Sequence, residues 1–532
     1  MCLTIYITLI GLQVGCHDLF IGENMSQRGT EKERLVAALV HHRAGRLKKA
    51  QRLYEKVLKS NPKSSDANHL LGVLIGDQGD VEGAKLSIAR AITIAPTKAH
   101  YHVNMGNLYE KTGDSSAALD AFRRAYSLDP EQVEAINNLV SILRRQGDYD
   151  ERKLLLENLI IKQPEWNLTH YHWGNLLLDQ GNREEAVSSY NRAIHFDPLH
   201  ANSYNNLGNA LLSLGRAKEA EAAFSMVLKH DPSNAEGHNN LGNSMLADGR
   251  IKEAADQYRL AIAARPNYGR AYYNLGTAFV EMGKLPSALF SYQRSLKIDP
   301  GNQSALHMVA ALSGNSTDAA PDSYVRNLFD GYAENFEKHL VDTLNYDIPS
   351  RLAKLFVELE PGALGEGIDL GCGTGLAGVA FRSCVERLTG VDLSGQMIEL
   401  ARQKKVYDQL ETDNIVNFLS QKAPLSYSLF LAVDVFNYVG DLMPVFREMG
   451  RRATPGAWLV FSTEGDAMND EGFHLGQFGR FLHSSPYIEK IAAEWGFTVV
   501  KNQREKLRRH RDEWIEGNLF FLQFNLGNRK NC

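Results

Sequence analysis

The pattern of small, aromatic and apolar residues changes near residue 320. Before it, glycine, alanine and aromatic residues return at a constant interval, with spacings that suit pairs of packed helices. After it, short apolar runs alternate with helical segments, which is typical of an α/β sheet. The chain of 532 residues is too long for one core. We therefore predict a helical N-terminal part and an α/β C-terminal part.

The helical pattern is marked by proline. Eight of the sixteen prolines are evenly spaced, at positions 62, 96, 130, 164, 198, 232, 266 and 300. Before Pro232 come Gly208, Ala220 and the aromatic Phe224, and most of the other units keep these relative positions. We expect helix–turn–helix units in which the small residues let two helices approach and the aromatic fills the gap to the next unit. A second glycine makes the turn, and proline ends the second helix.

This register resembles the tetratricopeptide repeat and predicts eight repeats over residues 31–302. Val140 and Arg152 stand where the fourth repeat should have glycine and alanine, so we expect looser packing there. Residues 303–312 should form a capping helix, and the small polar stretch 314–321 should be a linker. We take 303–322 together as cap and linker.

Asparagine recurs on the first helix of the predicted repeats. The series is Asn104, Asn138, Asn206, Asn240 and Asn274, with Asn107, Asn175, Asn209 and Asn243 on the same helix face one turn further on. It resembles the asparagine-lined groove of the O-linked N-acetylglucosamine transferases, which implies that carboxamides bind a protein or peptide backbone. The alternative is that these side chains join neighbouring repeats or face water.

A glycine-rich turn dominates the C-terminal part. In EGIDLGCGTGLAG (366–378), an apolar strand runs through Asp369 into Gly371, Gly373 and Gly375, and a helix follows. Glycines let the backbone approach a ligand, and the helix start supplies N–H donors. Residues 373–378 also satisfy the dinucleotide pattern, which is weak alone. The longer run resembles motif I of the class I S-adenosylmethionine-dependent methyltransferases. The fold class is therefore an all-α tetratricopeptide solenoid followed by an α/β Rossmann-like class I methyltransferase domain, over 323–532.

The neighbouring segments agree with this resemblance. A second strand ends in Asp392, a fourth covers 428–433, and a turn at 455–456 leads into a fifth. Residues 496–500 and 519–524 should form an antiparallel pair, which favours a methyltransferase over an oxidoreductase. The segments 323–340, 391–410, 432–442 and 479–488 look like bacterial methyltransferases fused behind tetratricopeptide repeats.

The resemblance implies S-adenosylmethionine as the cofactor. The implied cofactor residues are Gly371, Gly373 and Gly375, Asp369 near the methionyl ammonium, Asp392 on the ribose diol, Met397 as an adenine wall, Asp413 as the adenine partner, and Tyr332 as a lid. A structural turn with a solvated acid is the alternative for the motif, and plain helix packing is the alternative for Tyr332.

A general base is harder to assign. His483 lies between the fifth strand and the last helix, and Asp434 ends the fourth strand at the edge where α/β sheets bind ligands. Both are candidates for substrate contact, and Tyr438 and Glu464 are further candidates near the same edge. The alternative is that these side chains have a structural role, as a cap or in the interior. The basic run 504–511 should be a solvated hairpin arm.

Composition narrows the remaining possibilities. The chain has a net charge of −5 and so lacks the excess of basic residues that a nucleic-acid-binding module has. The five cysteines are scattered, without metal-ligand spacing, which fits a reducing compartment and a cytoplasmic location. Residues 2–15 are apolar but too few to span a membrane. We expect residues 1–24 to be a disordered extension or a mis-assigned start, with a cleaved signal as the alternative. The repeats begin near residue 31, so 1–30 form an N-terminal extension.

Three functions are compatible with these observations. The first is a methyltransferase whose repeats bind a protein substrate or partner. The second is a small-molecule methyltransferase with repeats as a scaffold, and the third is a scaffold with an inactive methyltransferase fold. The intact cofactor motif argues against the third. The segment Asp434–Asn437 lacks the Pro-Pro-Tyr pocket associated with amino-group methylation of bases or glutamine, so the accepting atom stays open.

Overall fold

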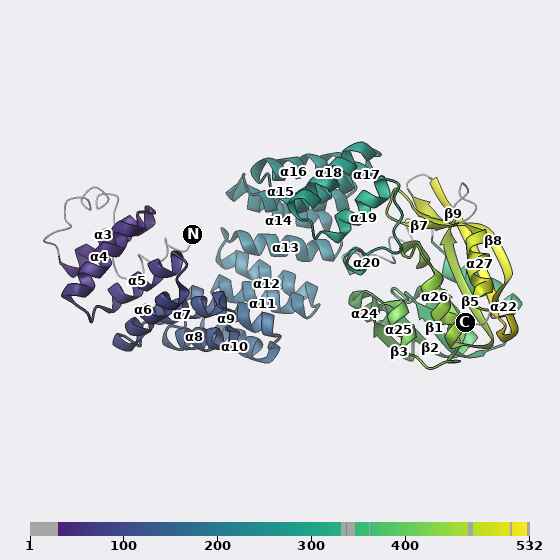
Figure 1. The fold of residues 1–532 in the computed structure, drawn as a ribbon, viewed down its shortest axis with the longest axis horizontal. Coiled ribbons are helices and arrows are strands. Elements are labelled where there is room, and N and C mark those ends of the chain that lie inside the picture. The colour runs from purple at the N-terminus through teal and green to yellow at the C-terminus, as the bar shows by residue number, and fades with distance from the viewer. Residues whose placement is uncertain are drawn as a thin grey trace. The chain divides into compact units, whose positions relative to one another are not determined.

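A computed structural model describes residues 30–330, 337, 346–360, 362–465, 472–510 and 513–528. Figure 1 shows helices only in the N-terminal half and a sheet flanked by helices in the C-terminal half. The chain forms two compact units, Met1–Glu165 and Trp166–Cys532. The first unit holds four helix pairs. The second holds four more pairs and the sheet.

Each predicted repeat is a pair of helices. The pairs are α3 (Glu31–Arg43) and α4 (Leu47–Ser60), α5 (Ser65–Asp77) and α6 (Val81–Ile94), α7 (Ala99–Lys111) and α8 (Ser115–Leu128), α9 (Val133–Gln146) and α10 (Tyr149–Lys162), α11 (Asn167–Asp179) and α12 (Arg183–Phe196), α13 (Ala201–Ser213) and α14 (Ala217–His230), α15 (Ala235–Ala247) and α16 (Ile251–Ala264), and α17 (Gly269–Glu281) and α18 (Leu285–Ile298). A glycine with positive φ makes the turn inside every pair, as at Gly45 (φ 70°) and Gly283 (φ 70°).

The aromatic residue of a unit packs against the first helix of the same unit. In the third and sixth repeats, a Cβ added at Gly106 would lie 2.5 Å from the Phe122 ring, and one at Gly208 would lie 2.5 Å from the Phe224 ring. The ring therefore occupies the space left by the glycine on the first helix of its own repeat. The close approach of the two helices is confirmed, and packing of the ring against the next unit stays a prediction.

The fourth repeat departs from the pattern at the predicted positions. Arg152 is only 1% exposed, in a place where the other repeats have alanine, and Val140 is also buried. The boundary between the two compact units follows directly after this repeat, at Glu165.

The sheet domain begins behind two further helices, α19 (Gln303–Leu312) and α20 (Asp322–Asp330). Its elements are α22 (Ile348–Leu359), β1 (Leu364–Leu370), α23 (Leu376–Phe381), β2 (Val385–Asp392), α24 (Gly395–Gln403), β3 (Gln409–Thr412), α25 (Ile415–Ser420), β4 (Tyr427–Ala432), α26 (Met443–Arg452), β5 (Ala453–Glu464), β6 (Phe473–Leu475), β7 (Phe481–His483), α27 (Ser485–Glu494), β8 (Phe497–His510) and β9 (Glu513–Phe524).

Seven strands form the main sheet in the order β3-β2-β1-β4-β5-β9-β8. The first five are parallel, and β9 is antiparallel to both of its neighbours. The class I methyltransferase fold is therefore confirmed, including the terminal antiparallel pair. The turn expected at 455–456 is instead a break in register inside β5, because Tyr427 pairs with Ala453 but Leu429 pairs with Trp458.

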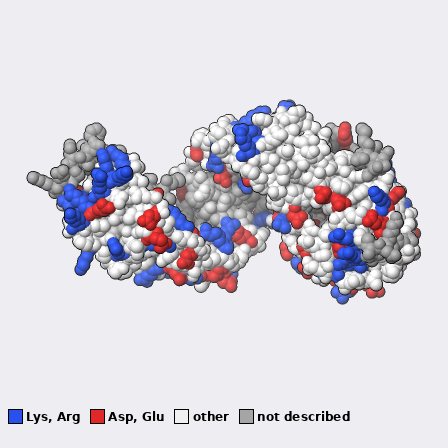
Figure 2. Space-filling view, viewed as in Figure 1, with Lys and Arg blue, Asp and Glu red and all other residues white. Residues whose placement is uncertain are grey.

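Apolar side chains from both faces of the sheet form two cores. One core joins the sheet to α25, α26 and α27, through residues such as Phe446 and Ile491. The other joins it to α22 and α23, through Phe356 and Phe381. Because β1 is parallel to both β2 and β4, the carboxyl ends of these strands lie at one edge, where α/β sheets place their ligands. Figure 2 shows Lys and Arg gathered over α3 and α4, and mixed with Asp and Glu elsewhere on the face in view.

Candidate cofactor and acceptor site

The glycine-rich loop between β1 and α23 adopts backbone angles that disfavour other residues. Gly371, Gly373 and Gly375 have φ of 68°, 52° and 94°. A Cβ at Gly371 would lie 2.6 Å from the Val435 side chain, and one at Gly375 would lie 3.1 Å from Tyr407. A Cβ at Gly373 meets no protein atom within 4 Å. The outer glycines are therefore needed for packing, whereas Gly373 faces open space.

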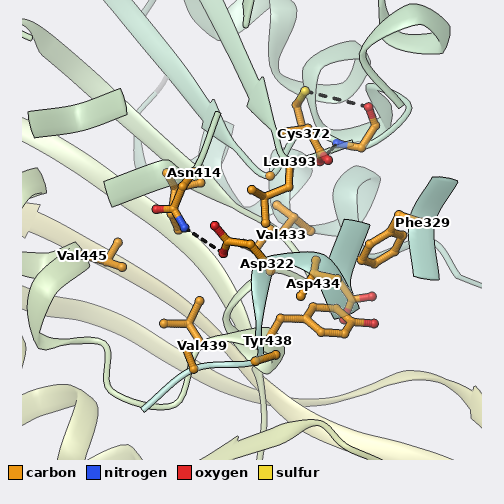
Figure 3. Close-up of a pocket in the computed structure, with 18 of the residues that line it drawn as sticks. Asp322, Phe329, Cys372, Leu393, Asn414, Val433, Asp434, Tyr438, Val439 and Val445 are labelled. Carbon is orange, nitrogen blue, oxygen red and sulfur yellow. Dashed lines mark hydrogen bonds between the residues drawn. The ribbon is translucent and has the colours of Figure 1, made fainter. Parts of the chain in front are cut away.

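That open space is a cavity of about 300 Å³ at the carboxyl edge of the sheet (Figure 3). This volume is at the lower end of the range of ligand pockets. Its walls come from the glycine loop, the ends of β2 and β4, the start of α25, and the segment before the sheet domain. Its lining includes Asp318, Asp322, Phe329, Gly373, Thr374, Asp392, Leu393, Asn414, Ile415, Asp434, Tyr438 and Val439.

Asp392 is the main acidic group of the cavity beside the loop. Its Oδ2 accepts from the backbone N–H of Gly373 at 2.9 Å, and its Oδ1 accepts from the N–H of Ser394 at 2.8 Å. Burial raises the pKa of Asp392, and these two hydrogen bonds oppose the rise. A carboxylate fixed in this way retains lone pairs that can accept from a diol.

Asp369 does not line the cavity, although it belongs to the same motif. It is 1% exposed, and its Oδ2 accepts from the Tyr407 hydroxyl at 2.6 Å. Burial raises the pKa of Asp369 to about 7. Its position behind the loop fits support of the loop, and its predicted contact with the methionyl ammonium stays a prediction.

Neither of the two residues expected around adenine, Met397 and Asp413, lines the cavity. Leu393, Asn414 and Ile415 line it instead, and Met397 is fully buried. Asn414 caps α25 by accepting from the N–H of Val416 at 2.9 Å. Tyr332, the predicted lid, lies outside the described residues.

Of the two predicted substrate contacts, Asp434 lines the cavity and His483 does not. The His483 ring is fully buried, its Nε2 lies 3.0 Å from the carbonyl oxygen of Gly440, and burial lowers its pKa to about 4. This position fits a structural role in the β6–β7 hairpin and does not fit direct substrate contact. Tyr438 lines the cavity, with its ring edge-on to Phe329 at a centroid distance of 5.3 Å.

Asp434 belongs to a charge cluster, which we define as Asp434, Glu464, Arg480 and Arg508; Glu464 and Arg508 are buried, and Asp434 and Arg480 are partly exposed. Oδ1 of Asp434 lies 2.9 Å from Arg480 and 3.1 Å from Arg508. Glu464 lies 2.7 Å from Arg480 and 2.5 Å from Arg508. Two cations thus balance two carboxylates. The prediction that the basic run 504–511 is a solvated hairpin arm was wrong for Arg508, which is 6% exposed.

The asparagine series makes contacts between repeats. Asn138 donates to Asn107 at 2.9 Å, Asn206 to Asn175 at 2.8 Å, and Asn240 to Asn205 at 2.7 Å. Asn274 donates to both Asn239 and Asn243, and Asn104 lies 2.7 Å from His69. These amide groups therefore help to join neighbouring repeats, whereas Asn209 is exposed.

The sequence signal missed several residues of the site. The connection before the sheet domain supplies Asp318, Asp322 and Phe329, which no local motif marks. Arg480 and Arg508 are found only when separate strands and loops come together. Among the described residues, no group of three or more potential ligands could hold a metal ion, and no helix has the length and hydropathy needed to cross a membrane.

Comparison with known proteins separates the two halves in the same way. Family models for the tetratricopeptide repeat match residues 35–99, 103–151, 171–235 and 209–269, and a second such model matches 269–302. A model of the methyltransferase domain matches residues 368–461.

The curated relatives match less than a fifth of the chain. A ubiquinone biosynthesis O-methyltransferase of Nitrosospira multiformis is 27% identical over 103 residues, which is 18% of this chain and 41% of that protein. The protein of the same description from Bordetella pertussis is 27% identical over 99 residues, with the same shares. The match thus spans about two fifths of the relatives' length.

Solved structures resemble the repeats. YrrB, described as a TPR protein with an unusual peptide-binding site, has 22% identity and a TM-score of 0.27, over 35% of this chain and 95% of that chain. A tetratricopeptide repeat protein from Parabacteroides merdae has 14% identity and a TM-score of 0.38, over 49% of this chain and 98% of that chain. On the evidence of the family models, the chain joins an N-terminal array of tetratricopeptide repeats to a C-terminal methyltransferase domain, as its sequence resemblances predicted.

Proposed function

We propose that the chain is a cytoplasmic S-adenosylmethionine-dependent methyltransferase whose repeats bind a protein or peptide. The observation that carries the proposal is the cavity between the glycine loop and Asp392. Gly373 faces this cavity with nothing within 4 Å of its Cβ position, so a ligand can approach the backbone there. The described cysteines Cys372 and Cys384 are free, which is compatible with a reducing compartment.

The chemistry of the cavity wall fits this cofactor. Asp392 can accept from the ribose hydroxyls, and Leu393 and Ile415 offer apolar surface for adenine. Asn414 presents a carboxamide beside them, and we assign it the adenine contact in place of Asp413. The Thr374 hydroxyl is buried in the same wall without a hydrogen-bond partner among the described residues.

When bound, S-adenosylmethionine supplies a methyl group that passes to a nucleophile as its carbon–sulfur bond breaks. The chain's own contribution is to hold the two reactants in line, which can be worth about 7–11 kcal/mol. Asp434 and Tyr438 line the cavity from the end of β4, so we assign them to orienting the acceptor. Because both arginines of the charge cluster hold Asp434, its carboxylate is positioned more firmly than a free side chain.

The repeats would serve the same reaction by recruiting a protein. Solenoids of this kind present extended binding surfaces. Part of the asparagine series can still offer a carboxamide to a peptide, because an oxygen that accepts one hydrogen bond, as Oδ1 of Asn107 does from Asn138, has a second lone pair. Oδ1 of Asn175 and Oδ1 of Asn243 each accept two hydrogen bonds within the array. Asn209, which is exposed, is our candidate for direct contact.

A second candidate is a methyltransferase of a small hydroxylated molecule. The observation in its favour is the similarity of part of the chain to O-methyltransferases of ubiquinone biosynthesis. In that case the repeats would bind a partner and not the acceptor.

Calorimetric titration of the full chain with S-adenosylmethionine tests the first step. We expect binding, and Asp392→Ala should weaken it at least tenfold. Asp413→Ala is the matched control, because its carboxylate lies outside the cavity lining. Absence of binding by the unmodified chain would disprove the proposal, and an equal loss in both variants would reverse the assignment of Asn414. Transfer of a labelled methyl group to a cell lysate then separates a protein acceptor from a small molecule.

A further inference from the structure

The segment between the repeats and the sheet domain is attached to the domain by backbone hydrogen bonds. We call residues 316–330 the connector. The N–H of Ala320 donates to the carbonyl of Tyr438 at 3.0 Å, and the N–H groups of Gly440 and Asp441 donate to the carbonyl of Asp318 at 2.9 and 2.8 Å. A Cβ at Gly440 would lie 2.7 Å from the carbonyl oxygen of Thr317. A segment expected to be only a linker thus packs directly on the loop after β4.

The connector also forms one wall of the cofactor cavity. Asp318, Asp322 and Phe329 line it together with Asn414 and Tyr438 from the sheet domain. Figure 3 shows Asp322 and Asn414 pointing toward one another, and Asn414 Nδ2 donates to Asp322 Oδ1 at 3.1 Å. The site is therefore built from both sides of the boundary between cap and domain.

Further contacts hold the end of the connector at the glycine-loop side. Arg326 Nε donates to the carbonyl of Leu393 at 3.3 Å, and Ser394 Oγ donates to Asp330 at 2.5 Å. Leu393 lines the cavity, and Ser394 donates its N–H to Asp392. The residues that fix Asp392 are thus tied to the connector.

The same connector packs against the last helix of the array. The Tyr324 hydroxyl lies 4.0 Å from the Met308 sulfur, and the Tyr324 ring lies 4.7 Å from the His307 ring. His307 Nε2 is 2.9 Å from the carbonyl of Gly479, in the β6–β7 hairpin. One apolar core runs from the fifth to the eighth repeat through Met308 and Tyr324 to Phe481. Displacement of α19 therefore moves residues that contact the connector.

We propose that the connector is a binding element of the cofactor site and that it couples cofactor affinity to the docking of α19 on the sheet domain. The inference rests on the proposed function, because it takes the ligand of the cavity to be S-adenosylmethionine. Coupling of this kind is reciprocal, so the cofactor also strengthens the docking. A protein partner that binds the last repeats and shifts α19 then changes the affinity for the cofactor without entering its cavity.

Two pairs of variants test the proposal, with S-adenosylhomocysteine titrated into the full chain. Asp322→Ala should weaken binding about three- to tenfold, in line with the loss of one hydrogen-bonding group. Asn327→Ala is its control, because Asn327 is exposed on the same helix outside the cavity lining. Met308→Ala should weaken binding at least threefold from outside the cavity. Its control is Met245→Ala, which removes a similarly buried methionine from α15 in the same core.

A second measurement needs no variant. Hydrogen exchange at the amides of Ala320, Gly440 and Asp441 should slow when S-adenosylhomocysteine saturates the chain, because these amides join the connector to the domain. The amide of Gly113, in the first compact unit, should not change.

The outcomes distinguish the two proposals. If the unmodified chain binds and both Asp322→Ala and Met308→Ala bind equally well, the coupling is disproved and the methyltransferase function stands. Unchanged exchange at the three connector amides on saturation would also disprove it. If the unmodified chain does not bind, the proposed function and the coupling fail together.

Discussion

Gly373→Ala is a direct test of the cofactor cavity, because it adds one methyl group at a place where the protein has room. The residue has φ of 52°, so alanine pays the left-handed backbone penalty of about 1–2 kcal/mol. No protein atom lies within 4 Å of the added Cβ, so we expect no further loss of stability from steric clash. The methyl group would occupy the cavity surface that the ligand is expected to touch. Affinity for S-adenosylhomocysteine should therefore fall at least tenfold.

The assay combines calorimetric titration with thermal unfolding, and Gly283→Ala is the matched control. Gly283 has φ of 70° and also has nothing within 4 Å of its Cβ position, but it lies in the turn between α17 and α18. Both variants should lose similar stability, and only Gly373→Ala should lose affinity. If Gly373→Ala binds as well as the unmodified chain, the ligand does not approach this part of the loop and the placement of the cofactor is wrong.

Three further perturbations follow from the packing and the buried charges. Burial raises the pKa of Asp369 to about 7, so between about pH 4 and 7 the folded chain holds a proton that the unfolded chain releases. The free energy of unfolding should therefore fall as the pH rises through this range. Asp369→Asn should flatten this fall in urea titrations, and an unchanged slope would contradict the reasoning. Gly208→Ala should lower the free energy of unfolding by about 1–3 kcal/mol, because the added methyl group contacts the Phe224 ring. Adding Phe224→Leu should recover part of the lost melting temperature, and no recovery would show that the clash lies elsewhere. Glu464→Gln should lower the free energy of unfolding by about 3–5 kcal/mol, because it leaves Arg508 partly unpaired. A loss below about 1 kcal/mol in urea unfolding would show that water screens the charges of the cluster.

The repeats were predictable because their determinants are local. A turn glycine, a terminal proline and a small residue at the helix crossing act within one unit, so a constant period in the sequence reports them directly. The position of the aromatic ring was not predictable in the same way. Phe224 keeps its register whether or not its ring packs on Gly208 of its own repeat, and only the three-dimensional packing shows this contact.

The glycine-rich loop was also predictable, because strand, glycines and helix are contiguous from Asp369 to Gly378. The acceptor side was not. His483 was expected to contact the substrate from the stretch between the fifth strand and the last helix, but the hairpin that carries it turns the ring into the interior. The sequence around Arg508 predicts an exposed basic run. Its partners Asp434 and Glu464 are 74 and 44 residues away in the sequence. Pairing of this kind depends on topology and leaves no local pattern.

The connector limits how freely the two halves of this chain can be exchanged between proteins. The methyltransferase family model begins at residue 368, yet the wall that carries Asp322 and Phe329 lies before that boundary. A recombination event that joined another repeat array at residue 368 would transfer the strands of the sheet and leave one side of the cavity behind. Inheritance of the last repeat, the cap and the sheet domain as one block is therefore expected.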